Sequence, residues 1–285
     1  MTRVGMISLG CAKNLVDAEI MLGHLLKAGM TIVNDPREAD AVIVNTCAFI
    51  DPAKKESIRA VFEADAVRRH CHPRQALVVS GCLAQRYPDN LRQEMPEIDA
   101  LMGLNEVPQV AEIVKRALAH RRAAGLRAGR QREAGAPLSF VSGQASYIPD
   151  HDTPRFRLTP PHTAFVKIAE GCNHPCTFCV IPQMRGRHRS RPVADVVKEA
   201  RRLIACGVKE LNLISQDSTY YGLDLWPAHE RDQRPFDHTV SRSFSQPSLL
   251  PVALVDDRRN PTHKPLAGGP RPPELPTLCT LIREL

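Results

Sequence analysis

The first 120 residues alternate short apolar runs with longer segments in which apolar residues recur at helical spacing. The apolar runs are predicted strands, and the longer segments are predicted helices. The strands are expected at Val4–Leu9, Ala41–Asn45 and Ala76–Ser80, and the helices at Leu15–Ala28, Pro52–Arg69 and Val107–Arg121. Such alternation is typical of helices wound around a parallel sheet. The sequence therefore predicts an amino-terminal parallel α/β domain over residues 1–122.

The rest of the chain is less regular. Residues 123–161 are rich in Gly, Ala, Arg, Ser and Pro without a sustained period, which predicts a linker. Residues 227–276 are rich in proline and are expected to be irregular, and residues 278–285 have an apolar helical pattern. Between these segments we expect a second strand–helix–strand unit, with elements at Ala164–Ala169, Val193–Ala205 and Glu210–Ile214.

Nine cysteines distinguish the composition. No apolar run reaches membrane-spanning length, and the first ten residues lack the features of a secretory signal, so we expect a cytoplasmic protein that does not enter a membrane. In that reducing compartment, cysteines more often bind metals or act in catalysis than form disulfides. The formal net charge of +7 is compatible with an RNA-rich or acidic partner, although a solvated basic face explains it equally well.

Three cysteines form a C-x3-C-x2-C motif directly after a predicted strand: Cys172, Cys176 and Cys179. Three thiolates on one loop can bind three irons of a four-iron cluster and leave the fourth iron open to an exchangeable ligand. Pro175 and the preceding glycine favour a wrapping loop over a helix. The alternatives are buried cysteines or a zinc site, but no fourth cysteine or histidine follows at zinc-finger spacing, although His174 lies within the loop.

Three other cysteines each follow a predicted strand: Cys11, Cys47 and Cys82. Because the carboxyl ends of parallel strands meet at one edge of a sheet, we expect these thiols to be neighbours. Glycine precedes Cys11 and Cys82 and lets the backbone approach a bulky group, whereas Thr46 precedes Cys47 and breaks this pattern. Buried core cysteines at strand ends are the alternative.

The C-x3-C-x2-C motif, with Phe178 before its last cysteine, resembles the radical S-adenosylmethionine superfamily. With three strand-end cysteines ahead of it, the chain is similar to the methylthiotransferases of that superfamily from residue 1 to about residue 225. The segments CAKNLVDAE, GCNHPCTFCVIPQMRGRHRSRP and LNLISQDSTYYGLDL most resemble the members that modify an aspartate of a small-subunit ribosomal protein near the decoding centre. A tRNA adenosine methylthiotransferase and an inactive iron–sulfur-binding fragment are the alternatives.

The resemblance implies two [4Fe-4S] clusters, one on each group of three cysteines, together with S-adenosylmethionine and an electron donor. It implies hydrogen removal from the aspartate β-carbon by a deoxyadenosyl radical, followed by methylthio transfer. No side chain is expected to act as a classical general base, so no catalytic residue is assigned. Phe178 is expected to lie behind the adenine of the cofactor. Ser215 and Gln216, with Asp217, follow the second strand of the radical domain and are expected either to contact the cofactor or to cap that strand.

Four arginines alternate with other residues in the segment RGRHRSR: Arg185, Arg187, Arg189 and Arg191. In an extended segment all four would point to one side. They are expected to engage carboxylates of substrate or cofactor, or else to form a solvated charged edge.

The three remaining cysteines carry weaker signals. Cys71 lies between His70 and His72 at the end of a charged helix, and we expect an exposed site without a metal. Cys206 and Cys279 are expected to be packing residues.

The resemblance ends near residue 225. The family continues with further strand–helix units and a small carboxyl-terminal β domain, whereas here a proline-rich stretch follows, and the segment PTLCTLIREL resembles the family's next helix. We therefore expect residues 162–285 to form an incomplete (βα) partial barrel, from a truncated gene product or half of a split protein. The carboxyl half is expected to fold poorly alone and to turn over weakly or not at all.

Overall fold

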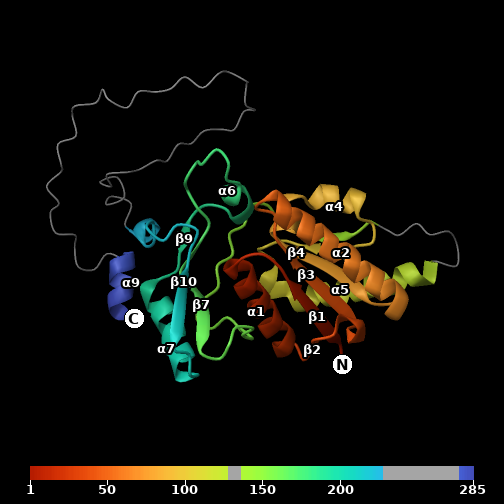
Figure 1. Ribbon diagram of the computed structural model, residues 1–285, viewed down its shortest axis with the longest axis horizontal. Helices are drawn as coiled ribbons and strands as arrows, with labels where there is room; N and C mark the ends of the chain where they lie inside the picture. Colours follow the sequence, from red (N-terminus) through yellow and green to blue (C-terminus); the bar gives the residue numbers. More distant parts are fainter. Residues whose placement is uncertain (128–135, 227–275) are drawn as a thin grey trace, which may run out of the picture.

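A six-stranded parallel sheet forms the amino-terminal half of the protein in the computed structural model, which describes residues 1–127, 136–226 and 276–285 (Figure 1). The strand order is β2-β1-β3-β4-β5-β6. The strands are β1 (Arg3–Ser8), β2 (Thr31–Val33), β3 (Ala41–Thr46), β4 (Ala76–Gly81), β5 (Ala100–Met102) and β6 (Leu138–Phe140). The central strands β3 and β4 are buried along their whole length, as expected of a parallel sheet covered on both faces. The predicted α/β fold class is confirmed.

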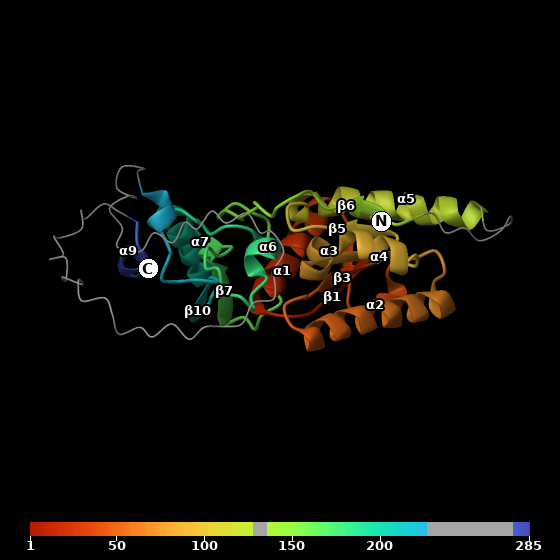
Figure 2. The same cartoon turned by 90° about the horizontal axis from the view of Figure 1, so that it is seen from above.

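Helices cover both faces of this sheet (Figure 2). One face packs against α1 (Ala12–Lys27) and α5 (Val110–Arg127), and the other against α2 (Asp51–Cys71), α3 (Cys82–Arg86) and α4 (Pro88–Glu94). The 3-10 turns η1 (Pro36–Glu38) and η2 (Val107–Gln109) precede β3 and α5. Successive residues of a strand point to opposite faces of the sheet. Ile43 and Val78 pack in the core with α1 and α5, whereas Val44 and Val79 pack in the core with α2.

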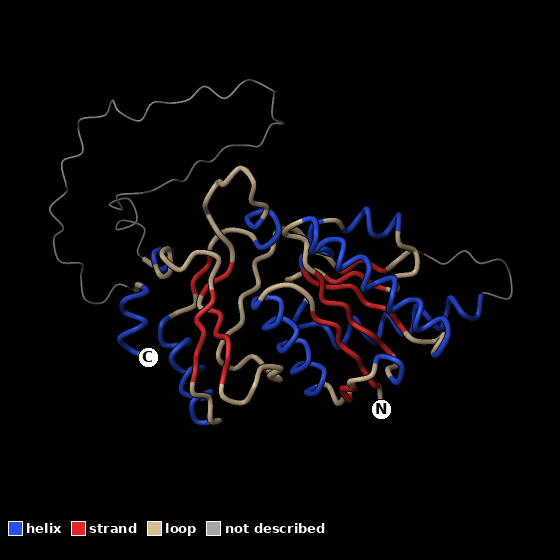
Figure 3. Tube along the Cα trace, viewed as in Figure 1, coloured by secondary structure: helices blue, strands red, loops and turns tan. Residues whose placement is uncertain are grey.

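The carboxyl-terminal half is built on the parallel strands β7 (Thr163–Lys167) and β10 (Glu210–Ile214), joined through α7 (Val193–Ala205). A short antiparallel pair follows β7, and α9 packs against α7. The further elements are β8 (Ala169–Glu170), α6 (Ile181–Arg185), β9 (Arg189–Ser190), η3 (Leu223–Leu225) and α9 (Leu278–Glu284). Helix α1 lies between the two sheets and packs against β7 as well as β1 (Figure 3).

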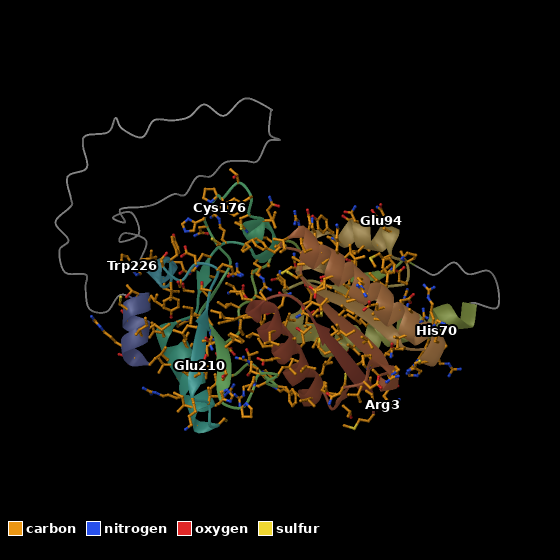
Figure 4. The ribbon with its side chains drawn as sticks, viewed as in Figure 1. Arg3, His70, Glu94, Cys176, Glu210 and Trp226 are labelled. Atoms are coloured by element: carbon orange, nitrogen blue, oxygen red, sulfur yellow. The ribbon has the colours of Figure 1, made fainter. Side chains whose placement is uncertain are left out.

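Both sheets present the carboxyl ends of their strands to the same side of the molecule. Figure 4 shows Arg3, where β1 begins, and Glu210, where β10 begins, on the side opposite Cys176. Segments that follow the strands of either half therefore meet on one side. None of the helices in the described ranges is both long enough and apolar enough to cross a membrane.

The structure corrects the prediction for residues 123–161. Helix α5 extends to Arg127, and β6 pairs with β5 as the sixth strand of the sheet, so this segment is not a linker throughout. Three residues are too few to show a strand pattern, which explains why β6 was missed. Residues 141–162 contain no helix or strand, as expected. The proline-rich residues 227–275 lie outside the described part of the chain. On either side of them, Trp226 Nε1 donates a hydrogen bond to Pro276 O at 2.9 Å.

A buried arginine ties α2 to the sheet. The guanidinium of Arg68 lies 2.7 Å from Asp65 Oδ1 and 2.6 Å from Asp99 Oδ2, and all three side chains are almost fully buried. Asp99 Oδ2 also accepts a hydrogen bond from the backbone N–H of Leu77 in β4, at 2.7 Å. Removing one partner of such a buried group leaves the others uncompensated.

We expect Arg68→Ala to lower the free energy of unfolding by about 3–5 kcal/mol, because Asp65 and Asp99 would remain buried without their cation. Arg59→Ala is the matched control: Arg59 pairs with Glu63 on the exposed face of the same helix, and its loss should cost about 0.5 kcal/mol or less. Urea unfolding followed by circular dichroism measures both. Equal losses for the two variants would contradict the role assigned to Arg68.

Candidate metal and cofactor site

The three strand-end thiols lie at the carboxyl edge of the six-stranded sheet, as predicted. Cys11 precedes α1 as its N-cap, Cys47 directly follows β3, and Cys82 is the first residue of α3, immediately after β4. Cys47 and Cys82 are buried and Cys11 is exposed. The backbone of Cys47 is fixed by Ser57, whose Oγ accepts from Cys47 N–H and donates to Cys47 O, each at 2.9 Å. The three thiols therefore line one rim of the sheet.

Two glycines allow the strand ends to approach so closely. Gly10 and Gly81 have φ values of +89° and +90°, which residues with a side chain rarely adopt. A Cβ on Gly10 would lie 2.8 Å from Cys47 Cβ, and one on Gly81 would lie 2.5 Å from Thr46 O. Close packing against the neighbouring strand end thus requires both glycines, whether or not a bound group is present.

The cysteines of the C-x3-C-x2-C motif lie on the loop between β8 and α6. Cys176 is exposed at the tip of this loop (Figure 4), whereas Cys172 and Cys179 are half-buried. The loop is held by Cys179 N–H donating to Cys176 O at 3.0 Å and Cys172 N–H donating to Gly186 O at 3.2 Å. Burial raises the pKa of the Cys172 thiol, and Asp217, Cys179 and Cys176 raise it further.

The donor chemistry of both groups fits an iron–sulfur cluster. All six thiols are free, and in a four-iron cluster each thiolate binds a different iron. Among the residues that the structure describes, no three Cys, His, Asp or Glu side chains are gathered tightly around the position of a single metal ion. Three thiols from either group would bind three irons of a four-iron cluster and would leave the fourth iron without a thiolate from that group.

The predicted cofactor residues lie on the loop or next to it. Phe178 is 83% exposed. The Oγ of Ser215 donates to Asp217 O at 2.9 Å and accepts from Asp217 N–H at 3.2 Å, which is the local capping arrangement considered as its alternative role. Gln216 Nε2 donates to Glu170 Oε2 at 3.2 Å, while its Oε1 is buried and accepts no hydrogen bond from the described residues.

A histidine–aspartate contact ties the loop to β10. His174 Nε2 lies 2.7 Å from Asp217 Oδ2, and the backbone N–H of His174 lies 3.5 Å from Cys172 Sγ. Burial would raise the pKa of Asp217, but hydrogen bonds from Thr219 and His174 outweigh this effect and lower it. The carboxylate therefore stays ionised beside the loop. Sequence reasoning placed both residues near the site but did not connect them.

Between the two thiol groups lies a buried set of polar side chains that the sequence analysis missed, here called the interface network. Asn14 Oδ1 is 2.6 Å from Arg185 Nη2 and 3.6 Å from Cys82 Sγ. Arg185 also pairs with Asp17 at 2.9 Å and with Glu170 at 3.0 Å. The interface network consists of Lys13, Asn14 and Asp17 from α1, Lys167 from β7, Glu170 from β8 and Arg185 from α6.

The two lysines complete the interface network. Lys167 Nζ pairs with Asp17 and lies 2.6 Å from Glu170 Oε1. Lys13 Nζ donates to Ala169 O at 2.5 Å. Burial lowers the pKa of Lys13 to about 8. Burial would raise the pKa of Glu170, but Lys167, Arg185 and Lys13 together hold it well below its usual value. Lys13 and Asp17 of the amino-terminal half thus contact charged or polar groups of the carboxyl-terminal half. The interface network therefore holds the two halves together.

A second contact between the halves uses the irregular segment 141–162. Arg155 Nε donates to Glu19 Oε2 of α1 at 2.7 Å, and Arg155 Nη1 donates to Glu199 Oε1 of α7 at 2.9 Å. Both carboxylates are buried. The predicted linker thus connects the halves through side chains as well as through the backbone.

The prediction that four arginines point to one side is wrong. Arg185 and Arg191 are buried in separate ion-pair networks, Arg191 with Asp195 and Glu199, whereas Arg187 is exposed. The reason is that Arg185 ends α6 and Gly186 follows with a positive φ, so the segment is not extended.

The remaining cysteines differ in part from expectation. Cys71 is exposed, and His70 and His72 each hydrogen-bond a backbone carbonyl, at 2.7 and 2.8 Å. Cys206 and Cys279 are exposed as well, so their interpretation as packing residues is wrong. Each lies at or near the end of a surface helix, where a short pattern does not define the inner face.

Known protein families match the amino-terminal and carboxyl-terminal halves of the chain separately. Residues 3–103 match the profile of an uncharacterized protein family, UPF0004, and residues 166–241 match the Radical SAM superfamily. The chain is 52% identical over 240 residues to "Ribosomal protein uS12 methylthiotransferase RimO" of Opitutus terrae, covering 83% of this chain and 49% of that protein. The protein of the same name from Akkermansia muciniphila is 49% identical over 252 residues, which are 87% of this chain and 52% of the relative. The chain spans about half the length of the curated relatives it matches.

We expect Glu170→Gln to lower the free energy of unfolding by about 3–5 kcal/mol at neutral pH, because Lys13, Lys167 and Arg185 would lose a buried counter-charge. A carboxylate with a depressed pKa stabilises the folded state above its ordinary pKa of 4.5, and this contribution is lost as pH falls through the folded-state pKa. The difference between parent and variant should therefore narrow below pH 4.5.

Urea midpoints at neutral pH and stepwise below 4.5 test this, with Glu63→Gln on the exposed face of α2 as the control. A difference between parent and Glu170→Gln that stays constant at every pH would show that Glu170 does not contribute through its charge.

Proposed function

Because this chain belongs to the radical S-adenosylmethionine methylthiotransferase family, we propose that it belongs to an enzyme that adds a methylthio group to the β-carbon of an aspartate in a small-subunit ribosomal protein. The substrate follows from the relatives, whose names specify ribosomal protein uS12. The observation that carries the proposal is the juxtaposition of two thiol groups: three thiols on one sheet rim and three on a neighbouring loop, on the same side of the molecule.

The family uses iron–sulfur chemistry and S-adenosylmethionine. We assign two [4Fe-4S] clusters to this chain, one held by Cys11, Cys47 and Cys82 and the other by the loop cysteines Cys172, Cys176 and Cys179. When bound, these groups supply the electron transfer and radical chemistry that protein side chains lack. An external electron donor is required as a partner.

The chain's own residues bind and orient the cofactor in this proposal. Phe178, exposed on the loop, offers an apolar face for the adenine. Gln216 has a buried Oε1 free to accept a hydrogen bond, and Ser215 forms the turn that places it. His174 and Asp217 hold the loop against β10. These assignments involve no general base.

The substrate is expected near the decoding centre of the small subunit, on or off the ribosome. A formal net charge of +7 favours approach to an RNA-rich particle. We expect the protein to act in the cytoplasm, because this substrate and thiols that must stay reduced both fit a reducing compartment. In this scheme the six-stranded sheet, which includes β6, and its helices form the unit with the strand-end cluster. Residues 141–162 connect the halves, and the half that begins at β7 forms the radical unit.

Anaerobic reconstitution with iron and sulfide should load about eight irons per chain, about four for each cysteine group. Replacing Cys172, Cys176 and Cys179 with alanine should remove about four irons and abolish 5'-deoxyadenosine formation in the presence of dithionite. Replacing Cys11, Cys47 and Cys82 should remove about four irons while deoxyadenosine formation persists. Cys206→Ala, at an exposed cysteine outside both groups, should change neither quantity. Full iron loading in either triple variant would refute that ligand set.

The substrate is tested by incubating the reconstituted chain with S-adenosylmethionine, sulfide, a reductant, and either small ribosomal subunits or bulk tRNA. We expect mass spectrometry to find, at low yield, the mass increase of one methylthio group on an aspartate-containing uS12 peptide, and to find unchanged tRNA nucleosides. Methylthioadenosine in the tRNA would replace this proposal with a tRNA methylthiotransferase. Iron loading without deoxyadenosine would identify an iron–sulfur-binding chain without turnover.

A further inference from the structure

One arginine connects the strand-end thiols to the other half of the molecule. Arg185 ends α6, six residues after Cys179, and its side chain is only 6% exposed. Helix α6 packs against α3, which begins at Cys82 (Figure 2). Asn14 Oδ1 lies 2.6 Å from Arg185 Nη2 and 3.6 Å from Cys82 Sγ, so a single oxygen contacts both the guanidinium and the thiol.

The charges around Arg185 do not cancel. Three buried cations, Lys13, Lys167 and Arg185, face two buried carboxylates, Asp17 and Glu170. The partly buried Arg189, which donates a hydrogen bond to the Arg185 carbonyl, is also a cation. Burial leaves this excess positive charge largely unscreened by salt. Of the three cations, Arg185 is the one linked to a strand-end thiol by geometry, because Asn14 Oδ1 contacts both its Nη2 and Cys82 Sγ.

A positive charge beside an iron–sulfur cluster favours its reduced form, because reduction adds a negative charge. Net charge, hydrogen bonding and burial are the means by which a protein sets the potential of such a cluster. We propose that Arg185 raises the reduction potential of an iron–sulfur cluster bound by Cys11, Cys47 and Cys82, an inference that rests on the ligand assignment in the proposed function. The carboxyl-terminal half thereby controls the potential of a cluster held by the amino-terminal half.

A purely structural role for Arg185 would have a different consequence. Arg185→Gln and Asp17→Asn both break the same 2.9 Å ion pair. If this only loosened the interface, the reduction potential of the cluster would shift in the same direction in both variants. Their electrostatic effects are opposite, because one removes a cation and the other removes an anion. The direction in which the reduction potential shifts in each variant therefore distinguishes an effect of charge from a loss of packing.

The experiment uses the full chain with Cys172, Cys176 and Cys179 replaced by alanine, so that only the strand-end cluster is loaded. Its midpoint potential is measured by redox titration monitored by electron paramagnetic resonance. At the potential where this parent is half reduced, Arg185→Gln should lower the ratio of reduced to oxidised cluster about ten-fold, a shift of about 59 mV for a one-electron couple. Asp17→Asn should raise the ratio. Arg185→Lys, which keeps the charge, should stay closer to the parent, and Arg187→Gln, at an exposed arginine, should match it.

Iron counting and circular dichroism on each variant distinguish the two possible failures. If the parent itself loads no cluster, the ligand assignment in the proposed function is wrong, and the inference falls with it. If the parent loads about four irons but Arg185→Gln leaves the potential unchanged, or shifts it in the same direction as Asp17→Asn, the ligand assignment stands and the tuning role is overturned.

Discussion

The interface network is the constraint on which the rest of this structure depends. Burying Lys167, Glu170 and Arg185 against α1 removes charges from water at a cost that only their mutual pairing offsets. The charged side chains of the interface network are shielded from water only when both halves are in contact. The pairing also fixes one geometry, because Arg185 must reach Asn14, Asp17 and Glu170 at once. Docking of the halves and placement of the cysteine loop are consequently a single event.

The two thiol groups are held by different physical means. The strand-end thiols owe their positions to the sheet: positive φ angles at Gly10 and Gly81 and the Ser57 hydrogen bonds to Cys47 set the rim by backbone geometry. The loop thiols depend on few contacts, chiefly those of Cys172 N–H with Gly186 O and of His174 with Asp217. The rim is thus organised in advance, whereas the loop has more freedom to adapt to what it binds.

Much of the fold could be predicted because its central elements have clear periods. The buried strands β3 and β4 read as continuous apolar runs, and α7 and β10 lie within their predicted limits. The strand-end location of Cys11, Cys47 and Cys82 followed from parallel topology alone. Strands of three residues, such as β5 and β6, carry no period and were missed.

The interface network could not be predicted for a different reason. Lys13 and Asp17 lie outside the apolar stripe of α1, and an amphipathic pattern places such residues in solvent. Their burial depends on a partner 150 residues away in the chain, Lys167, which local patterns do not reveal. Arg185 was misjudged because the turn at Gly186 separates it from the arginines that follow.

We propose that the chain holds two iron–sulfur clusters on one side of the molecule, at a separation fixed by the docked halves. Arg185 lies six positions after Cys179, a stretch that spans at most about 20 Å, and Asn14 Oδ1 links its guanidinium to Cys82 Sγ. The most direct measurement is pulsed electron paramagnetic resonance on the reconstituted, reduced chain. We expect two cluster signals with a dipolar coupling that disappears when either cysteine group is replaced. Two clusters without measurable coupling, or a single cluster signal, would contradict the account.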